Sequence, residues 1–570
     1  MPKSAGIFAF MFFYFLSLSS VSAQSTQPKA LFEQVLVEQT PLSAPQAKIL
    51  DYIQKDTATI RFAVVKINPA LFLEEKTINL NLFPNENFTT TTNKIDQRGE
   101  QDFSWHGNAP GHFSNILLTV YKEAVAGYII IDDDYFNVRS IGNGLHVLIQ
   151  VDPRKSARCG TGAASNSNAS SRDNNTAFAR GEIFKSSTTN HLAKTMSNTI
   201  IKVLVAYTTA AKNLAGEENG ITAIINSAKD AANISYTNSA VAIELQIAHT
   251  EEVNYSETSA SVAKTPRYCS NLGPFDLSVM LTDFQAGNGA MASIPNLRGL
   301  YGGDVAVLLV APGFLPGNDN GQAFEINVPA DEAFCVVNYD QAAAAGAWTF
   351  AHEIGHLQGC RHDKAADKCN DPYPHGHGYF LPNTNWRTMM AVGSGTRIQH
   401  WSNPNIFYQG VRTGDTTTAN NALVLTQRAG TVANFVEEIS GTISSNKTIS
   451  GIASLTANVT VSSGVTLTMA ATAQVFFRDG VSLTINSGAN LIINAGAKLK
   501  FASGARIIVN GKITADSNDP NKRITFTGTT ATPGFWNGIT INSGSSTNVS
   551  TLRRCDVQYA TTGITITYTG

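Results

Sequence analysis

The chain has 570 residues, of which 43% are hydrophobic, and its formal net charge is −2. This length predicts several domains, and the apolar content is sufficient for packed cores. A nearly neutral charge argues against nucleic acid or an anionic membrane as the main partner.

The first 23 residues have the features of a signal peptide. Lys3 precedes an apolar run at 5–18, and small residues at 21–23 follow before Gln24. The run is too short to span a membrane comfortably, and no second stretch of about eighteen apolar residues follows. We therefore expect export to a secreted or cell-surface location, with no membrane insertion once the signal is removed.

Two regions of contrasting composition come next. Residues 24–162 contain short alternating apolar and polar runs bounded by turn residues, for example at 60–66, 116–120 and 127–131, which predicts a mostly β domain. Residues 163–198 are rich in Ser, Asn, Thr and Ala without a hydrophobic period, as is typical of a mobile linker and maturation region. Candidate cleavage points in this linker are Arg180, Lys185 and Lys194.

Residues 199–437 alternate between strand and helix patterns. A buried strand at 200–206 precedes a helix with apolar residues at i, i+3, i+4 and i+7 from Ile221. Further strands are expected at 241–247 and 304–311, the second of them continuously apolar and therefore central. The pattern predicts an α/β domain.

Two later segments of this domain should lie near its cleft. Either 324–328 or 334–338 is expected at the edge of the sheet, where an extended peptide could pair with it. Residues 340–350 are Ala-rich and begin with Asp340, a good N-cap residue, so we expect a helix there that runs into the next motif.

The motif at 352–363 carries the chemistry, and it reads His-Glu-Ile-Gly-His-Leu-Gln-Gly-Cys-Arg-His-Asp. On a helix, His352 and His356 lie one turn apart on one face, with Glu353 beside them. Gly359 stands where a helix commonly ends, so the chain can return and bring His362 to the same point. Three neutral imidazoles and one open position predict a catalytic Zn²⁺ site, with Glu353 as general base. A shorter HExxH occurs by chance in ordinary helices, whereas this longer spacing is far rarer.

This motif resembles that of the metzincin zinc peptidases, HExxHxxGxxH followed by a Met-turn. Asp363 is similar to the choice made in the reprolysin-like branch, and the flanks resemble the bacterial peptidyl-Asp metalloendopeptidase group. The resemblance covers about 199–437, and the matching stretches are 201–208, 255–258, 348–352, 386–391, 401–404 and 421–435.

The resemblance implies roles for further residues. Met390 would be the Met-turn residue, with Met389 as the alternative, and the region ahead of the peptidase would be a pro-domain. The group favours cleavage before Asp, which requires a cationic pocket. Arg397 and His400 are the candidate substrate-binding residues, although each residue type is more often on the surface.

Cys159 stands apart from the other five cysteines, upstream of the expected catalytic domain. A thiolate is a soft zinc ligand that can fill the open position, and the segment resembles the cysteine switch of metzincin zymogens. The alternative is a disulfide half or a free thiol. Candidate disulfides elsewhere are Cys360–Cys369 and Cys269–Cys335, which leaves Cys555 without an obvious partner.

A histidine pair after the motif offers further imidazoles. His375 and His377 lie in a loop rich in Gly and Pro, while the zinc already has three ligands. We expect them to be surface residues or ligands for another ion.

The character of the sequence changes near residue 440. Glycines recur every eight residues from Gly480 to Gly504, with short alternating runs between them, which predicts a solenoid of stacked parallel coils. The region 440–570 resembles the right-handed parallel β-helix proteins of bacterial surfaces, which implies binding of glycan or cell-surface material. A β-sandwich is the alternative. Because Gly570 directly follows a strand-like run, without a polar cap, we expect the solenoid to be incomplete.

Together these features predict a secreted zinc endopeptidase that is made as a zymogen and acts on proteins or peptides. One alternative is an adhesin or glycan-binding protein with a vestigial metal domain. Another is a zinc hydrolase acting on non-peptide amides or esters. The intact histidines, glutamate and Met-turn argue against a vestigial site.

Overall fold

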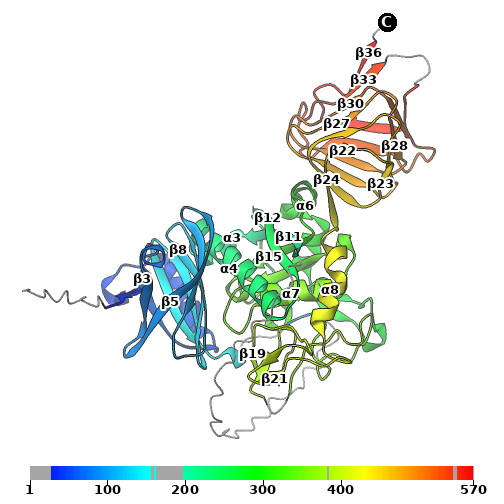
Figure 1. Cartoon of the computed structure of the whole chain (residues 1–570). Coiled ribbons are helices and arrows are strands. Elements are labelled where there is room, and N and C mark those ends of the chain that lie inside the picture. The colour runs from blue at the N-terminus through cyan, green and yellow to red at the C-terminus, as the bar shows by residue number, and fades with distance from the viewer. Residues whose placement is uncertain are drawn as a thin grey trace, which may run out of the picture.

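A computed structural model describes residues 27–155, 159–161, 197–381, 384–393, 395–543 and 549–568. Three modules follow one another along the chain, and they are called here the N-terminal (27–155), central (197–435) and C-terminal (436–568) modules (Figure 1). The expected signal peptide and the three candidate cleavage points lie outside the described residues. Within the described ranges, no helix is long and apolar enough to cross a membrane.

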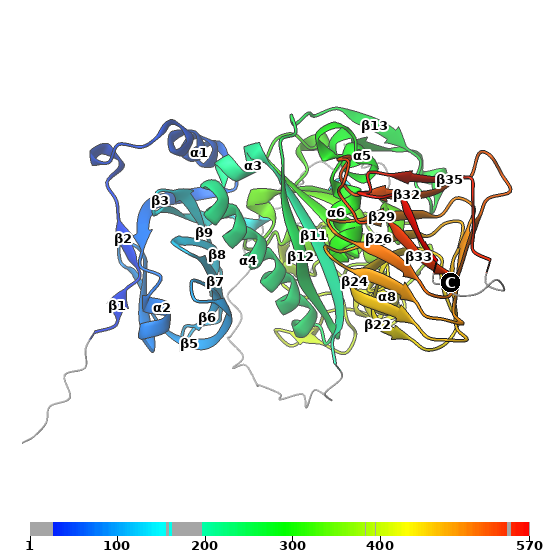
Figure 2. The same cartoon turned by 90° about the horizontal axis from the view of Figure 1, so that it is seen from above.

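The N-terminal module is a ten-stranded sheet in the order β1-β4-β5-β6-β7-β8-β9-β10-β3-β2, which curls around an apolar core of its own (Figure 2). Ser43 begins the helix α1 with a capping box formed with Gln46. The elements are β1 (Lys29–Ala30), β2 (Phe32–Gln34), α1 (Ala44–Lys55), β3 (Thr59–Ile67), α2 (Leu71–Glu74), β4 (Thr77–Phe83), β5 (Glu86–Gly99), β6 (Asp102–Asn108), β7 (Ser114–Tyr121), β8 (Ala124–Ile131), β9 (Asp134–Gly142), β10 (Leu145–Val151) and the 3₁₀ turn η2 (Pro153–Lys155).

The central module has a five-stranded sheet, β12-β11-β15-β17-β16, in which only β16 is antiparallel to its neighbour. Its core lies on both faces, because alternate residues of β11 pack in opposite directions, Val203 with α4 and α7 and Leu204 with α5 and α6. The elements are β11 (Thr199–Thr208), α3 (Thr209–Leu214), α4 (Glu217–Asn238), β12 (Ile243–Val253), β13 (Ser261–Lys264), β14 (Phe275–Ser278), α5 (Val279–Ala286), α6 (Ile294–Tyr301), β15 (Val305–Val310), β16 (Gly321–Ala323), β17 (Phe334–Asn338), α7 (Thr349–Gln358), β18 (Trp386–Arg387), β19 (Thr396–Arg397), β20 (Phe407–Tyr408), β21 (Val411–Arg412) and α8 (Asn421–Val432).

Two expectations for the central module are wrong. The sheet ends at β16, so neither 324–328 nor 334–338 is the edge. The Ala-rich segment 340–350 is not one helix, because α7 begins only at Thr349. Positive φ at Gly346 and Trp348 interrupts a helix there, and contacts with the N-terminal module add to local turns: the Ala345 amide donates to Asn137, and Asp340 pairs with Arg139 instead of capping a helix.

The C-terminal module stacks short strands that all pair in parallel, which does not fit the antiparallel β-sandwich alternative. Residue pairs such as Gln474 with Lys498 lie 24 positions apart, so three of the eight-residue steps complete one coil. The strands are β22 (Val436–Ile443), β23 (Lys447–Ile449), β24 (Ile452–Val461), β25 (Thr466–Met469), β26 (Gln474–Phe477), β27 (Ser482–Ile485), β28 (Asn490–Asn494), β29 (Lys498–Phe501), β30 (Arg506–Val509), β31 (Lys512–Asp516), β32 (Ile524–Gly528), β33 (Ile539–Ser543), β34 (Thr551–Arg553), β35 (Cys555–Gln558) and β36 (Ile564–Tyr568).

Helix α6 joins the central and C-terminal modules (Figure 2). Gly299 lies so close to the Phe476 ring that a Cβ atom there would come within 2.2 Å of it. The Leu300 carbonyl accepts hydrogen bonds from Ser454 at 2.8 Å and from Arg478 at 2.7 Å. The two modules therefore meet through a fitted contact as well as through the chain that links them.

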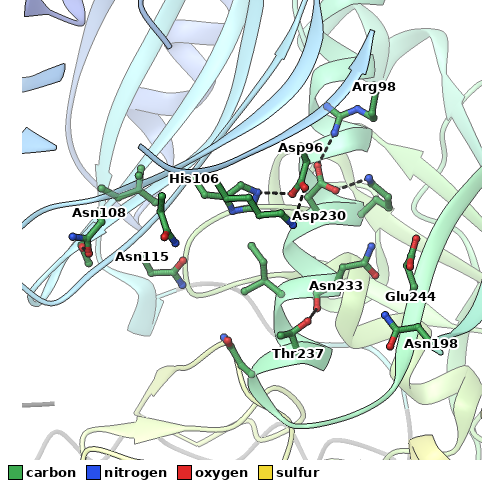
Figure 3. A pocket seen from close by; sticks show the side chains of 18 of the residues that line it. Asp96, Arg98, His106, Asn108, Asn115, Asn198, Asp230, Asn233, Thr237 and Glu244 are labelled. Carbon is green, nitrogen blue, oxygen red and sulfur yellow. Dashed lines mark hydrogen bonds and ion pairs between the residues drawn. The ribbon is translucent and has the colours of Figure 1, made fainter. Parts of the chain in front are cut away.

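Helix α4 fills the space between the N-terminal and central modules, where its apolar residues share one core with Leu117, Ala126 and Tyr128 of the N-terminal sheet. Polar contacts frame this core, and Arg98 pairs with the buried Asp230 at 2.9 Å. A polar cavity of about 660 Å³ lies beside that ion pair (Figure 3).

Candidate metal centre

The centre begins on α7, whose ten residues are all buried. The helix ends at Gly359 with φ 109°, a left-handed conformation that Gly adopts without strain. The chain then turns back and brings the His362 Nε2 atom to 3.3 Å from that of His352 and 3.2 Å from that of His356. The three imidazoles of the motif therefore converge on one point.

Backbone carbonyls fix the orientation of two rings. His352 donates from Nδ1 to the Met389 carbonyl at 2.8 Å, and His356 donates from Nδ1 to the Cys360 carbonyl at 2.8 Å. A carbonyl can only accept, so each Nε2 is left with its lone pair directed at the common point. Burial lowers the pKa of both histidines well below the usual value, which keeps them neutral as metal ligation requires.

The donor set fits Zn²⁺. Zinc–nitrogen bonds of about 2.0–2.1 Å in a tetrahedron place the nitrogens about 3.3 Å apart. The two distances to His362 match that spacing. The residues that could hold the ion are thus His352, His356 and His362, with a fourth position left to fill.

Cys159 lies beside these three histidines. Its sulfur is 3.4 Å from the His356 Nε2 atom, and the four candidate ligand atoms all lie within 4.8 Å of one another. Cys159 pairs with Gly321 of the edge strand β16 in a parallel bridge, and the Gly160 amide donates to the Gly321 carbonyl at 3.0 Å. The segment ahead of the central module therefore runs directly through the centre.

Glu353 faces the same point from α7. Its Oε2 atom accepts a hydrogen bond from the Thr161 hydroxyl at 2.9 Å, and that hydroxyl accepts one from the Ala323 amide at 2.7 Å. Burial raises the pKa of Glu353 to about 8, although the interactions with Cys159 and Thr161 act in the opposite direction. Thr161 was not predicted from the sequence, and its place two residues after Cys159 was the available signal.

Met390 and Met389 are both fully buried beneath the histidines. A Cβ atom on Gly355 would lie 3.2 Å from the Met390 sulfur and 2.6 Å from the Trp401 ring, so the turn packs tightly under α7. Met389 contributes its carbonyl to His352, while Met390 contributes its side chain to the floor.

Residues 197–402 match the family model Reprolysin_5, metallo-peptidase family M12. A peptidyl-Asp metalloendopeptidase of Xanthomonas campestris pv. campestris is 29% identical over 437 residues, which cover 74% of this chain and 96% of that protein. A protein of the same description from Stenotrophomonas maltophilia is 32% identical and covers 57% of this chain and 71% of that protein. A third, from Pseudomonas fragi, is 54% identical over 69 residues, which are 11% of this chain and 47% of that protein.

The chain belongs to metallo-peptidase family M12. It is a metzincin-type zinc metalloendopeptidase.

The His362 segment of the metallopeptidase is held by hydrogen bonds that were not predicted from the sequence. Asp363 accepts hydrogen bonds from the Ala365 amide at 3.1 Å and the Val392 amide at 2.9 Å, which ties the His362 segment to the Met-turn. His377 is buried and donates from Nδ1 to the His362 carbonyl at 2.8 Å. The expectation of a surface residue was therefore wrong for His377, while a role as ligand for another ion stays a prediction.

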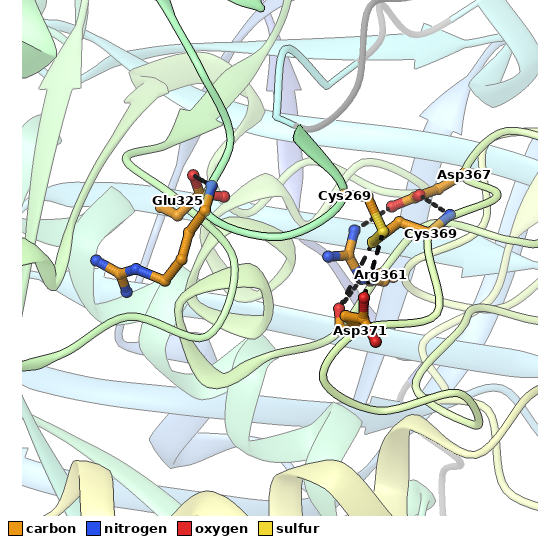
Figure 4. The surroundings of a disulfide bond; sticks show 7 residues. Cys269, Glu325, Arg361, Asp367, Cys369 and Asp371 are labelled. Carbon is orange, nitrogen blue, oxygen red and sulfur yellow. Dashed lines mark hydrogen bonds and ion pairs between the residues drawn. A yellow bond between two sulfur atoms is a disulfide. The ribbon is translucent and has the colours of Figure 1, made fainter. Parts of the chain in front are cut away.

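The disulfide of this metallopeptidase joins Cys269 to Cys369, so both pairs suggested by the sequence are wrong (Figure 4). Cys335 and Cys360 are buried and free among the described residues. Nearby, Arg361 and Asp367 form a buried ion pair at 2.8 Å. A bond between residues 100 positions apart depends on the tertiary fold, which explains why spacing did not reveal it.

The two candidate substrate-binding residues are withdrawn from solvent, Arg397 buried and His400 half-buried, contrary to what their residue types suggest. Arg397 donates to the Ala347 carbonyl just ahead of α7. The His400 ring packs against Tyr408 with centroids 5.4 Å apart, and burial lowers the pKa of His400 to about 4. His400 is therefore neutral near pH 7 and supplies no positive charge.

Proposed function

We propose that this metallopeptidase is an exported zymogen with a signal peptide at 1–23, a pro-domain at 24–162, a maturation linker at 163–198, a catalytic domain at 199–437 and a right-handed parallel β-helix at 440–570. The β-helix would attach the enzyme to glycan or cell-surface material. The convergence of three imidazoles, one thiol and the Glu353 carboxylate carries the proposal. Because the three histidines and Glu353 are all present and converge, the alternative of an adhesin with a vestigial metal domain has no support.

His352, His356 and His362 would hold a Zn²⁺ ion, which would supply Lewis-acid chemistry toward the scissile carbonyl and the attacking water. Glu353 acts as general base, taking a proton from the attacking water and passing it to the leaving amine. In the precursor its Oε2 atom is engaged by Thr161. Departure of residues 159–161 frees that oxygen and exposes the edge strand β16, to which an extended peptide would pair.

The general-base assignment is tested by Glu353→Gln. This variant should retain one zinc per chain, because the histidines are untouched, while kcat for casein hydrolysis falls by at least about 10²-fold. Metal analysis and a casein assay with and without a chelator measure the two effects. Glu217→Gln, at an exposed position on α4, is the matched control. Near-normal proteolysis by zinc-loaded Glu353→Gln would remove the assignment.

Latency is tested by Cys159→Ala in the full precursor. The thiol no longer fills the fourth position, so the uncleaved precursor should hydrolyse a general substrate at least about tenfold faster than the parent. Cys555→Ala, remote from the centre, serves as control and should stay latent. Equal latency of the Cys159 variant and the parent would contradict the switch.

We further propose that the enzyme cleaves peptide bonds beside Asp, as the names of its relatives state for those proteins. Such a preference requires a positively charged group within reach of the centre. Digestion of denatured protein substrates followed by mass spectrometry of the new termini measures it.

A further inference from the structure

Two arginines on the wall of the centre form no direct ion pair with a carboxylate of the described residues. Arg387 on β18 and Arg397 on β19 lie opposite each other in a parallel strand pair, and each is only 7% exposed. Among the described residues, no carboxylate oxygen lies within 4.0 Å of either guanidinium. The Nε atom of each is buried without a hydrogen-bond partner.

Such an arrangement is unfavourable unless something else compensates it. A buried charge without a counter-ion in direct contact pays a large desolvation penalty, and two like charges side by side add repulsion. The more distant carboxylates of Asp363, toward Arg387, and Glu353, toward Arg397, offset only part of this, because burial still lowers the pKa of both arginines. Burial, together with the neighbouring Arg397, lowers the pKa of Arg387 to about 9. Backbone carbonyls orient the pair without neutralising it: Arg387 donates to Gly393 at 2.7 Å, and Arg397 donates to Ala347.

The pair lies next to the reacting centre. Between β18 and β19 the chain forms the turn with Met389, whose carbonyl orients His352. The positive charge of Arg397 also contributes, after burial, to the lowered pKa of His352. A ligand bound by this pair would thus be held against the bond under attack.

The N-terminal module covers this wall in the precursor. The turn η2 packs against β19, and Pro153 lies so near Gly346 that a Cβ atom there would come 2.6 Å from the proline Cβ. Part of the burial of Arg397 is therefore supplied by the segment that leads to Cys159. Loss of that segment would open the pair to a substrate.

We propose that Arg387 and Arg397 together form the receptor for a substrate carboxylate and set the preference for Asp. This inference rests on the peptidase function proposed above. Guanidinium groups present several N–H donors in a plane, which suits bidentate binding of a carboxylate, and two of them would surround it. His400 takes no part in charge recognition, because it is neutral and packed against Tyr408.

The test compares two peptides that differ only by Asp or Asn at the cleaved position, with the mature enzyme and its Arg387→Gln and Arg397→Gln variants. We expect the parent to prefer the Asp peptide in kcat/KM. Each variant should lower the Asp-to-Asn ratio by at least about tenfold, as expected when a charged contact is lost. Arg387→Lys and Arg397→Lys should restore part of the ratio, because they keep the charge. Arg412→Gln, at an exposed position, is the control and should keep the parental ratio.

A binding measurement separates this inference from the peptidase function. Fluorescent Asp and Asn peptides are titrated into zinc-loaded Glu353→Gln with and without each arginine change, and thermal unfolding checks that each variant is folded. Stronger binding of the Asp peptide that disappears in the arginine variants supports the receptor. Cleavage or binding without any Asp preference, or arginine variants that weaken both peptides equally, would overturn it while leaving the peptidase function intact. If the parent cleaves neither peptide, the proposed function fails, and the binding arm alone decides on the receptor.

Discussion

His146 is a buried histidine of the N-terminal module whose protonation would cost a hydrogen bond. It lies on β10 and is fully buried, and its Nε2 atom accepts a hydrogen bond from the Val125 amide at 3.0 Å. Burial lowers the pKa of His146 to about 4, against about 6.5 in an unfolded chain. Between these values the unfolded state binds the proton and the folded state does not, so stability falls as the pH falls.

We predict that the free energy of unfolding of the N-terminal module drops by up to about 3 kcal/mol between pH 6.5 and pH 4 because of this one group. Hydrogen exchange of peptides from β8 to β10 in the precursor, corrected for intrinsic rates, measures it. His146→Gln keeps an acceptor for Val125 but does not titrate, so its pH dependence should be weaker. An identical dependence in the variant would assign the effect to other groups.

At the metal centre, the sequence was sufficient where spacing determines geometry. His352, Glu353 and His356 lie on one helix, and Gly359 allows the return to His362, so their convergence could be predicted from local rules. Thr161 and His377 could not be predicted in the same way, because their roles arise from contacts between distant parts of the chain. Burial of Arg397 was missed for the same reason.

Secondary-structure elements with sequence repeats or strong apolar periods could be predicted. Very short elements, and segments that contact another module, could not. The eight-residue glycine spacing indicated the stacked strands of the C-terminal module because each corner needs a residue at positive φ, such as Gly480 or Gly504. The edge strand β16 has only three residues and no pattern of its own. The segment 340–350 was mistaken for helix because Gly346 and Trp348 adopt positive φ and the Ala345 amide donates to Asn137 of another module.

On the scale of the whole molecule, the N-terminal module is attached by far more than its linker. It shares an apolar core with α4, and two buried carboxylates of the central module form ion pairs with its arginines: Asp340 with Arg139, and Asp230 with Arg98 as well as with Lys229 of the central module itself. Tyr52 adds a hydrogen bond to Asp340 at 3.2 Å. Removing one member of a buried ion pair costs about 3–5 kcal/mol, because the other charge stays buried.

We predict that cutting the linker alone does not release the N-terminal module. A specific protease site placed within 163–196 and then cleaved should leave both fragments in one peak on gel filtration. In Arg139→Gln the same cut should release the N-terminal fragment at micromolar concentration. Arg61→Gln, whose ion pair with Glu86 lies inside the N-terminal module, is the matched control and should stay associated. Release from the parent after cleavage would show that the covalent tether was essential.

The packing of α6 against the C-terminal strands affects how far the catalytic centre lies from a target bound on the coils. Gly299 admits the Phe476 ring, and only residues 433–435 separate α8 from β22, so a packed contact and a short connection both hold the stack against the central module. Each added or deleted coil would shift anything held on the far coils by about 4.8 Å along the stacking direction. The number of coils would then set the distance between the catalytic centre and a tethered target. It would thereby determine which peptide bonds of the target reach the centre, without changing the centre itself.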